Sequence, residues 1–351
     1  MSSEWWELPV KGIDNEIVKM AELRQAQLTK PPGSLGRLEE LAIKLAGMQG
    51  KVKPELDSIQ IVVFAADHGV AELGVSAFPQ EVTAEMVKNF SRGGAAISVL
   101  AESLGANFKV VNVGTVTELP NLAKVVDARV AAGTKNFIDM PAMTLEELEQ
   151  AFRVGRAAIE ELDRSIDLYI GGEMGIANTT SAAALASALI QVAGDRVVGS
   201  GTGVDRVGVA NKAKVVNAAL EFHLRDCGDE FKSPLEIARR VGGFEIVALA
   251  ASYIYAAQSG IVVMVDGFIS SVAALLAVRL NSEVREWMFF SHRSAEQGHS
   301  LVLEELQAEP LLDLGMRLGE GSGAAVAVPL LMQACKLHFN MATFAEAGVA
   351  S

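Results

Sequence analysis

The feature that most constrains the fold is a repeated alternation of short β-branched runs with alanine-rich segments. The runs occupy residues 59–65, 108–113, 124–130, 168–170, 196–198, 261–265 and 286–290. Most of them precede a turn that carries Gly or Asp, and a segment rich in Ala follows the turn. This order is typical of proteins in which each strand of a parallel sheet is followed by a helix. We therefore predict an α/β fold with a parallel, Rossmann-like, doubly wound sheet.

Two helical segments come before the first predicted strand. Residues 14–28 place apolar side chains at helical spacing after an Asp14 or Asn15 cap, and residues 36–48 form the second segment. These two helices are expected to form a small helical subdomain. The last predicted helix, near residues 323–337, contains Pro329, so we expect a kink there.

Composition excludes several classes of protein. The chain of 351 residues carries a formal net charge of −13 and has no basic stripe, so no nucleic acid partner is expected. Cys227 and Cys335 stand alone, as in reduced cytosolic proteins. Polar and charged residues interrupt the most apolar stretch, residues 243–278, which we interpret as helix, buried strand and helix. We expect a cytoplasmic protein with no signal peptide and no membrane partner.

Two glutamates each lie between glycines. Residues 171–175 read Gly-Gly-Glu-Met-Gly directly after a predicted strand, and residues 319–323 read Gly-Glu-Gly-Ser-Gly directly before an apolar helix. Flanking glycines let backbone or ligand approach a carboxylate closely, whereas the alternative is a solvated acid in a glycine turn. Ligands of such sheets bind outside the carboxyl ends of the strands. Two glycine brackets at that edge therefore favour a functional site.

Glu320, in the second bracket, is the candidate general base. Burial would raise the pKa of its carboxyl, and the N-terminus of the following helix would lower that pKa. With these effects opposed, the carboxylate stays ionised at neutral pH and is still basic enough to accept a proton.

Two glycine-containing turns are candidates for phosphate binding. Residues 199–205 read Gly-Ser-Gly-Thr-Gly-Val-Asp between a predicted strand and a helix, and residues 171–180 end in Asn-Thr-Thr before an Ala-rich helix. Small residues with free N–H groups at a helix N-terminus bind anions well. Lys212 could supply a cation, or it could be a solvated helix lysine. Neither turn has a Walker A or a full dinucleotide-binding fingerprint.

His292, Glu296 and His299 have the i, i+4, i+7 spacing of one helical face. Metal ligation is one interpretation of this spacing, and a polar cap over the site or a simple surface position is the other. Since no further cluster of ligands supports a metal, the sequence favours the polar cap. Asp67 and His68 follow a predicted strand and are either catalytic or part of a hydrogen bond that orders the loop.

Nine strings in the order found here resemble the nicotinate-nucleotide–dimethylbenzimidazole phosphoribosyltransferase family. The resemblance runs from about residue 28 to 349, nearly the whole chain. The strings occupy residues 30–36, 66–70, 78–83, 171–180, 199–205, 241–245, 266–268, 291–296 and 318–323. Each string is weak alone, but the set is highly specific.

The resemblance implies a large α/β domain at residues 51–324 and a small helical domain built from residues 1–50 with part of 325–351. It implies a homodimer and a reaction without metal or cofactor. The implied reaction moves the 5-phosphoribosyl group from nicotinate mononucleotide to 5,6-dimethylbenzimidazole. Its products are α-ribazole 5′-phosphate and nicotinate, in cobalamin lower-ligand synthesis.

The resemblance also assigns roles to individual residues. It makes Glu320 the general base, puts Glu173 beside the ribose and phosphate, and aligns Lys212 with the lysine after the Gly-Thr-Gly turn, with Lys214 as the alternative. The other implied substrate-binding residues are Phe78, Gln80, Met86, Gly175, Asn178, Thr179, Thr180, Gly201, Thr202, Gly203, Asp266, Gly267, Phe268 and Ser291. The acceptor base stays open between benzimidazole, adenine and phenolic compounds.

Two other functions are compatible with the residues when the family resemblance is left aside. One is a nucleotide-dependent oxidoreductase that uses residues 199–203, but the chain lacks an acidic residue clearly placed at the next strand end. Failure to bind NAD(H) tightly would dismiss it. The other is a non-catalytic nucleotide-binding or scaffold module, which would bind ligand without turnover and would be indifferent to Glu320→Gln.

We predict that exhaustive chelation leaves activity unchanged. The departing nicotinate is already an activated leaving group, so the implied chemistry needs no Lewis acid. Elemental analysis of the purified protein should find no stoichiometric transition metal. One zinc per chain, with activity lost on its removal and restored on its return, would contradict this prediction and support the histidine set as metal ligands.

Overall fold

Six strands form one sheet in which all neighbouring strands are parallel. The structure, a computed structural model, describes residues 4–162, 165–201, 203–228 and 230–349. The strands are β1 (Ile59–Ala66), β2 (Asn107–Gly114), β3 (Val125–Asp127), β4 (Leu168–Met174), β5 (Val262–Val265) and β6 (Met288–Phe290). Their order across the sheet is β3-β2-β1-β4-β5-β6. The predicted α/β fold with a parallel sheet is therefore confirmed.

The strand order reverses between β1 and β4. The chain adds β2 and β3 on one side of β1, and then β4, β5 and β6 on the other. β1 and β4 are paired in a register that sets Phe64 opposite Glu173. In open α/β sheets a ligand crevice forms outside the carboxyl ends of the strands at this kind of reversal. The topology thus directs the search for a site to the ends of β1 and β4.

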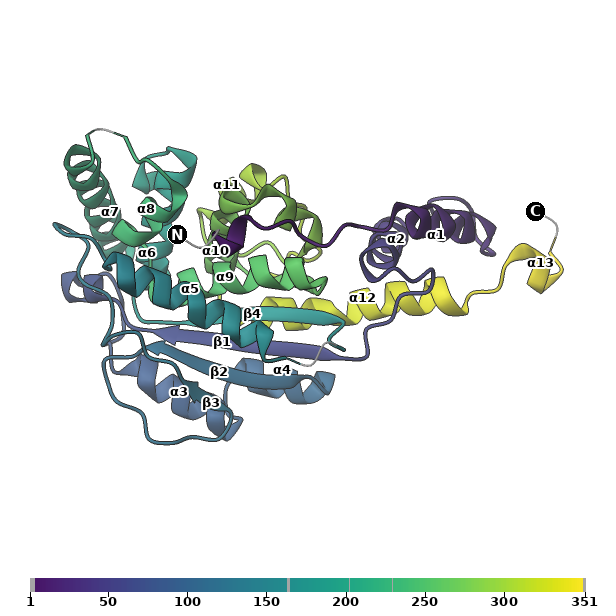
Figure 1. Ribbon diagram of the computed structural model, residues 1–351, viewed down its shortest axis with the longest axis horizontal. Helices are drawn as coiled ribbons and strands as arrows, with labels where there is room; N and C mark the ends of the chain where they lie inside the picture. Colours follow the sequence, from purple (N-terminus) through teal and green to yellow (C-terminus); the bar gives the residue numbers. More distant parts are fainter. Residues whose placement is uncertain (1–3, 163–164, 202, 229, 350–351) are drawn as a thin grey trace.

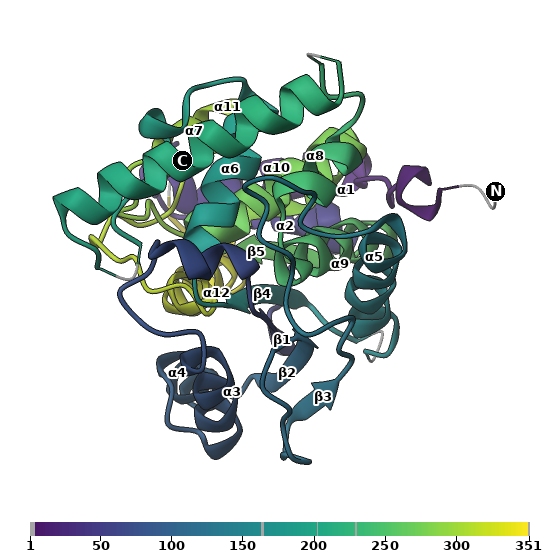
Figure 2. The same cartoon turned by 90° about the vertical axis from the view of Figure 1, so that its left-hand side faces the viewer.

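Helices cover both faces of the sheet. Figure 2 shows α3 (Val82–Arg92) and α4 (Ala96–Leu104) on one side of the strands, with α5 (Leu145–Glu160) and α9 (Phe244–Ser259) on the other. The remaining α-helices are α1 (Asn15–Gln27), α2 (Arg37–Gln49), α6 (Asn178–Ile190), α7 (Arg206–Asp226), α8 (Pro234–Val241), α10 (Phe268–Leu280), α11 (His299–Glu305), α12 (Ser322–Asn340) and α13 (Phe344–Ala347). Short 3₁₀ segments are η1 (Trp5–Glu7), η2 (Gly69–Leu73), η3 (Gly194–Arg196) and η4 (Ser282–Trp287).

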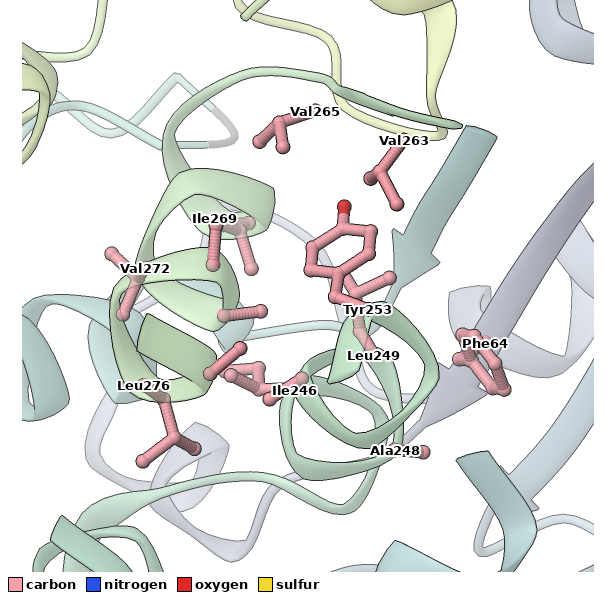
Figure 3. Close-up of a cluster of buried hydrophobic side chains, with 14 of the residues drawn as sticks. Phe64, Ile246, Ala248, Leu249, Tyr253, Val263, Val265, Ile269, Val272 and Leu276 are labelled. Atoms are coloured by element: carbon pink, nitrogen blue, oxygen red, sulfur yellow. The ribbon is translucent and has the colours of Figure 1, made fainter. Parts of the chain in front are cut away.

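A large part of the core lies where α9 and α10 pack beside the sheet. Both helices are apolar on most of their surface and are buried over most of their length. Figure 3 shows this cluster, with side chains from β1, α9, β5 and α10 in one group: Phe64, Ile246, Ala248, Leu249, Tyr253, Val263, Val265, Ile269, Val272 and Leu276. The apolar stretch at residues 243–278 is thus helix, strand and helix, as predicted. No helix in the described ranges is long and apolar enough to cross a bilayer.

Helices from the two ends of the chain lie side by side. α1 packs on α2, and α2 packs on α12, away from the middle of the sheet (Figure 1). The Arg24 side chain donates to the carbonyl oxygen of His338 at 2.8 Å, and Thr29 N–H donates to that of Ala342 at 3.0 Å. Asp14 caps α1 as predicted, because its carboxylate accepts from the N–H groups of Glu16 and Ile17.

The prediction of a strand at residues 196–198 is wrong. The chain forms η3 there and then a turn in which Val197 and Val198 N–H both donate to the Gly194 carbonyl oxygen. β4 is already paired with β1 on one edge and β5 on the other, so no place beside it is open. Val197 and Val198 are still buried, which explains why an apolar run was mistaken for a strand. Pro329 lies inside α12, as predicted, and the kink stays a prediction.

We predict that Gly155→Ala destabilises the protein. A Cβ atom on Gly155 in α5 would overlap the backbone of Ala248 in α9, so the two helices would have to separate. Overpacking of this kind costs about 1–3 kcal/mol, which exceeds the gain of about 1 kcal/mol from replacing glycine in a helix. The check is urea unfolding, with Gly12→Ala as the control because nothing lies within 4 Å of a Cβ atom there. Equal stability of the two variants would contradict the close packing of α5 on α9.

Candidate active site

A pocket of about 420 Å³ opens at the carboxyl ends of the strands. Its wall comes from the turn between β4 and α6, from α3, from the start of α10, and from two loops at residues 292–296 and 317–320. The predicted site residues that line it are Phe78, Met86, Glu173, Asn178, Thr179, Gly201, Gly267, Phe268 and Glu320. The fold thus brings residues from five separate strings of the sequence to one cavity.

The two glycine brackets are packed directly against each other. A Cβ atom on Gly172 would overlap the backbone of Glu320, and one on Gly319 would overlap the Glu173 carboxylate. Glu320 itself has φ 66°, in the left-handed region that side chains other than glycine rarely adopt. Backbone strain of this kind persists only where the surroundings enforce it, and it is common at functional sites. The glycines are therefore needed for contact between the two acidic turns.

Glu320 is a buried carboxyl at the wall of the pocket. Its side chain is 5% exposed, and its Oε2 accepts a hydrogen bond from Ile97 N–H at 3.4 Å. Burial raises the pKa of Glu320 from the ordinary 4.5 to about 7, against the Ile97 hydrogen bond and with added repulsion from Asp266. A carboxylate with this pKa is close to the ideal for a general base at neutral pH.

Glu173 has a different electrostatic environment from Glu320. Burial raises its pKa well above the usual value, and the nearby charges of Asp266, Glu245 and Glu320 act in the same direction. The side-chain amide of Asn178 donates a hydrogen bond to Glu173 Oε2, which opposes the rise. The two carboxyls thus differ in their hydrogen-bond partners and in the charges that surround them. Different surroundings let neighbouring acids take different roles.

Asp266 fixes the turn that carries Glu320. It follows β5, does not line the pocket, and accepts hydrogen bonds from Gly321 N–H at 3.1 Å and Ala324 N–H at 2.8 Å. These N–H groups belong to the start of α12, where a carboxylate is favoured by the unpaired donors and the helix dipole. Ser291 in turn donates to the Asp266 carbonyl oxygen at 3.2 Å. Asp266 and Ser291, both predicted to bind substrate, therefore support the turn that carries Glu320 from behind.

The candidate phosphate cradle contains a buried cation. Lys212 is 1% exposed, and its Nζ donates to Thr179 Oγ1 at 2.9 Å and to the Gly199 carbonyl oxygen at 3.2 Å. A Cβ atom on Gly201 would lie 2.8 Å from the same Nζ, so this turn and the start of α6 meet at the lysine. Burial lowers the Lys212 pKa to about 8. Lys214 is exposed, so the geometry favours Lys212 over it.

Several predicted residues do not reach the pocket surface. The Gln80 side chain donates to the His68 carbonyl oxygen at 3.1 Å, which orders the loop before α3. Gly175 and Thr180 are buried behind the wall, whereas Gly203 is exposed with nothing within 4 Å of a Cβ atom. Thr202 lies outside the described residues.

The helical interpretation of the histidine set is wrong. His292 pairs with Leu312 in a β-bridge, Glu296 lies in a turn, and α11 begins only at His299. His299 Nδ1 accepts from Ser294 N–H at 2.7 Å, and its Nε2 lies 2.9 Å from Ser271 Oγ. A turn at residues 294–298 precedes the helix, so the spacing in the sequence does not correspond to one face. Among the described residues, no group of three or more His, Cys, Asp or Glu side chains is placed to hold a metal ion.

Asp67 and His68 make loop-ordering contacts. His68 Nε2 lies 2.7 Å from Glu245 Oε1, with both side chains fully buried, and Asp67 Oδ2 accepts from Val116 N–H at 2.8 Å. Neither residue lines the pocket. The contacts agree with the loop-ordering alternative rather than the catalytic one.

Sequence reasoning missed Arg317 and misjudged Glu296. Arg317 is the only lysine or arginine among the described residues that line the pocket, and its Nη1 donates to the Gly201 carbonyl oxygen at 2.7 Å. Its position three residues before Glu320 could have pointed to it. Glu296 was considered as a metal ligand or as part of a polar cap, and the structure places it among the residues that line the pocket. Apolar wall residues such as Val82 and Ile269 carry no sequence feature that predicts a site, except that they adjoin predicted site residues.

Residues 10–349 match the model of a protein family described as phosphoribosyltransferase, which gives the class of the protein. A Pseudomonas aeruginosa protein named nicotinate-nucleotide–dimethylbenzimidazole phosphoribosyltransferase is 54% identical over 350 residues, 99% of either chain. A protein of the same name from Azotobacter vinelandii is 54% identical over 352 residues, covering 100% of this chain and 99% of that one. The chain belongs to the nicotinate-nucleotide–dimethylbenzimidazole phosphoribosyltransferase family.

Solved structures agree with this assignment. The crystal structure of CobT from Thermus thermophilus superposes with a TM-score of 0.90 at 46% identity, covering 95% of this chain and 99% of that one. A second structure of the phosphoribosyltransferase from the same organism gives a TM-score of 0.90 at 44% identity, covering 97% and 100%. The fold described above is therefore the fold of this family over nearly the whole chain.

We predict that Glu320→Gln stabilises the protein more at pH 8 than at pH 5. The folded pKa of about 7 lies above the ordinary 4.5, so the folded state holds a proton that the unfolded state has lost between these values. Stability therefore falls as pH rises through this window, by up to about 3 kcal/mol, and a glutamine does not titrate. Urea unfolding of both proteins at the two pH values checks this. A stability difference that does not change with pH would contradict the raised pKa.

Proposed function

We propose that this chain transfers the 5-phosphoribosyl group from nicotinate mononucleotide to 5,6-dimethylbenzimidazole, releasing nicotinate and forming α-ribazole 5′-phosphate for the cobalamin lower ligand. Family membership supports the reaction. The observation that carries the mechanism is Glu320, a carboxyl at the pocket wall whose pKa is raised to about 7 by burial. The acceptor base is the point on which the pocket is least specific, and adenine or phenolic acceptors stay open.

The nucleotide donor already carries an activated leaving group. In the nucleotide the nicotinate ring nitrogen is a pyridinium, and it leaves with the electron pair of the C1′–N bond as a neutral nitrogen. No acid is needed to protonate it. The unprotonated ring nitrogen of the benzimidazole donates its lone pair to C1′ from the opposite face. Attack on that face inverts the β-linkage to α.

The acceptor must lose one proton as it is ribosylated. Positive charge develops on the benzimidazole ring as the new C1′–N bond forms, and the N–H of its other nitrogen becomes acidic. Glu320 accepts that proton, which requires its ionised form. Burial holds the pKa of the neighbouring Glu173 well above its usual value, so Glu173 ionises less readily than an exposed carboxyl.

The donor phosphate is assigned to the cradle at residues 175–180 and 201–203. The start of α6 offers N–H groups and a helix dipole, and Lys212 lies behind Thr179 and Gly201 as a buried cation. Arg317 adds a second positive charge from the other side of Gly201. In a protein with a formal net charge of −13, these are the basic groups that adjoin the pocket.

The acceptor is assigned to the apolar wall opposite the cradle. Phe78, Val82 and Met86 contribute from α3 and the loop before it, and Phe268 and Ile269 contribute from the start of α10. Aromatic and apolar walls with few polar groups are typical of sites for flat heteroaromatic ligands. Gln80 supports this wall from behind through its hydrogen bond to the His68 carbonyl.

The domain division is part of the same proposal. We assign residues 51–324 to a doubly wound α/β domain, and residues 1–50 with part of 325–351 to a small helical domain. The packing of α1 and α2 on α12, and the contacts of Arg24 and Thr29 with the C-terminal segment, support this division. The homodimer and the cytoplasmic location remain predictions from the resemblance and the composition.

We predict that Glu320→Gln lowers kcat by roughly 10²–10⁴, the usual contribution of a general base. Glutamine keeps the shape of the side chain but cannot accept the proton, so nucleotide binding and the fold should be preserved. The measurement is nicotinate release with and without dimethylbenzimidazole, with Glu102→Gln as a control because Glu102 is exposed on α4. A folded Glu320→Gln protein with near-normal kcat would rule out this assignment.

We predict that Lys212→Ala raises KM for the nucleotide more than KM for the base. The substitution removes the buried cation from the cradle, whereas the acceptor wall is formed by other elements. Lys214→Ala, two residues further along α7 and exposed, should leave both KM values unchanged. Equal effects on the two substrates, or a larger effect of Lys214→Ala, would contradict the assignment of the phosphate.

A further inference from the structure

Glu296 is a buried carboxylate with unused hydrogen-bonding capacity at the pocket wall. The residue is 7% exposed and lines the pocket on the segment after β6. Neither Oε1 nor Oε2 has a hydrogen-bond partner among the residues that the structure describes. Its backbone N–H donates to Ser294 Oγ at 3.3 Å, so the main chain at this position is anchored while the side chain is not.

An unpaired carboxylate at such a position is unfavourable in the folded protein. Buried polar groups are almost always hydrogen-bonded, and a buried charge without a partner costs several kcal/mol. Positions of this kind are retained where a ligand supplies the missing donors. An ionised carboxylate has two acceptor oxygens and no donor, so the matching ligand group presents two donors close together. The cis-diol of a ribose is such a group, and acidic side chains commonly bind ribose hydroxyls in nucleotide-binding folds.

The position of Glu296 agrees with a ribose ligand. A Cβ atom on Gly199 would overlap Glu296 Oε2, and the carbonyl oxygen of this same Gly199 accepts from Lys212 Nζ. Glu296 therefore lies beside the candidate phosphate cradle. Glu320 lines the same pocket from a different segment, the turn before α12. A ribose 5-phosphate carries its diol and its C1′ atom on the same ring, between the phosphate and the base.

Pairing with Lys212 does not account for Glu296. The Glu296 charge opposes the lowering of the Lys212 pKa, so the two groups are near each other. However, the hydrogen bonds that the described residues provide to Lys212 Nζ go to Thr179 Oγ1 and the Gly199 carbonyl oxygen, and both Glu296 oxygens stay unpaired. The described residues thus leave the hydrogen-bonding capacity of this buried carboxylate unused.

We propose that Glu296 binds the 2′- and 3′-hydroxyl groups of the ribose in the nucleotide donor. This makes it the residue that selects ribonucleotide over deoxyribonucleotide donors. The inference rests on the proposed transfer reaction and adds to it the group that recognises the sugar. Glu296 takes no part in bond formation at C1′, so its contribution is to hold the ring in place between phosphate and acceptor.

The test compares nicotinate mononucleotide with its 2′-deoxy and 3′-deoxy analogues. Each is assayed with the wild-type protein, Glu296→Gln and Glu304→Gln. Glu304 is an exposed glutamate on α11, so it is a matched control for the loss of one charge in the same segment. Deoxygenation also changes the intrinsic reactivity of the C1′–N bond. For each enzyme we therefore take the ratio of kcat/KM for the ribonucleotide to kcat/KM for the deoxynucleotide. This ratio is then compared between the variants and the wild type. The intrinsic reactivity of the donors is the same for every enzyme, so it cancels in the comparison.

A lost hydrogen bond to a charged group corresponds to a change of roughly 10- to 100-fold. We expect the ribo-to-deoxy ratio to fall by this factor in Glu296→Gln and to stay unchanged in Glu304→Gln. Thermal unfolding of each variant shows whether it is folded, and Glu296→Ala provides a second variant that cannot accept any hydrogen bond.

Three results would overturn the inference. One is a ratio in Glu296→Gln and Glu296→Ala equal to that of the wild type. Another is an equal loss of kcat/KM for all three donors, which indicates electrostatic support of Lys212 instead. The third is a change confined to the acceptor, seen as an altered preference among bases. Failure of the proposed function is distinguishable, because the wild-type protein would then not release nicotinate from the ribonucleotide at all.

Discussion

The contact between the two glycine-bracketed turns is the constraint on which the rest of the site depends. Gly172 lies in β4, where the absence of a side chain lets the backbone of Glu320 reach the strand. Glu320 is held with φ 66° there, and Asp266 stabilises the turn through the first N–H groups of α12. The ends of β4 and β5 and the start of α12 thus define the position of one carboxylate. A larger residue at Gly172 would displace the backbone of Glu320.

Burial gives an acidic protein a working acid–base site. Glu173, Asp266 and Glu320 are all buried near one another, and their mutual repulsion adds to desolvation. Within the described ranges, no arginine or lysine forms a salt bridge with them, and His292 lies 3.7 Å from Asp266. Instead, the hydrogen bonds differ: Asp266 accepts from two backbone N–H groups, whereas Glu320 accepts from one at 3.4 Å. A hydrogen bond to the charged form lowers a pKa, so these donors oppose the rise that burial causes in both carboxyls. The positive groups, Lys212 and Arg317, are kept on the other side, at Gly201.

The sequence correctly predicted those features of the structure that depend on neighbouring residues in the chain. The β-branched run at residues 59–65 became the fully buried β1, Asp14 caps α1, and residues 243–278 form α9, β5 and the start of α10. The predictions of a strand at residues 196–198 and of a helical face at His292, Glu296 and His299 were wrong. An apolar run is buried whether or not a neighbouring strand has a free edge, so Val197 and Val198 are buried without being part of the sheet. The spacing of His292, Glu296 and His299 has meaning only inside a helix, and the helix begins at the last of them.

The sequence by itself determined the parallel α/β class, the glycine brackets and, through its nine strings, the family. These depend on residue type and order along the chain, which are local quantities. Only the tertiary structure decided which side chains meet. It placed Asp266 behind the turn that carries Glu320 rather than in the pocket, buried Lys212 while leaving Lys214 exposed, and brought Arg317 and Glu296 to the cavity wall. Burial and pKa depend on neighbours distant in the chain: Ile97 contacts Glu320 from 223 positions away. A contact of this kind exists only after the sheet has ordered its strands, because the strand order, not the spacing in the sequence, sets the distance between the turns.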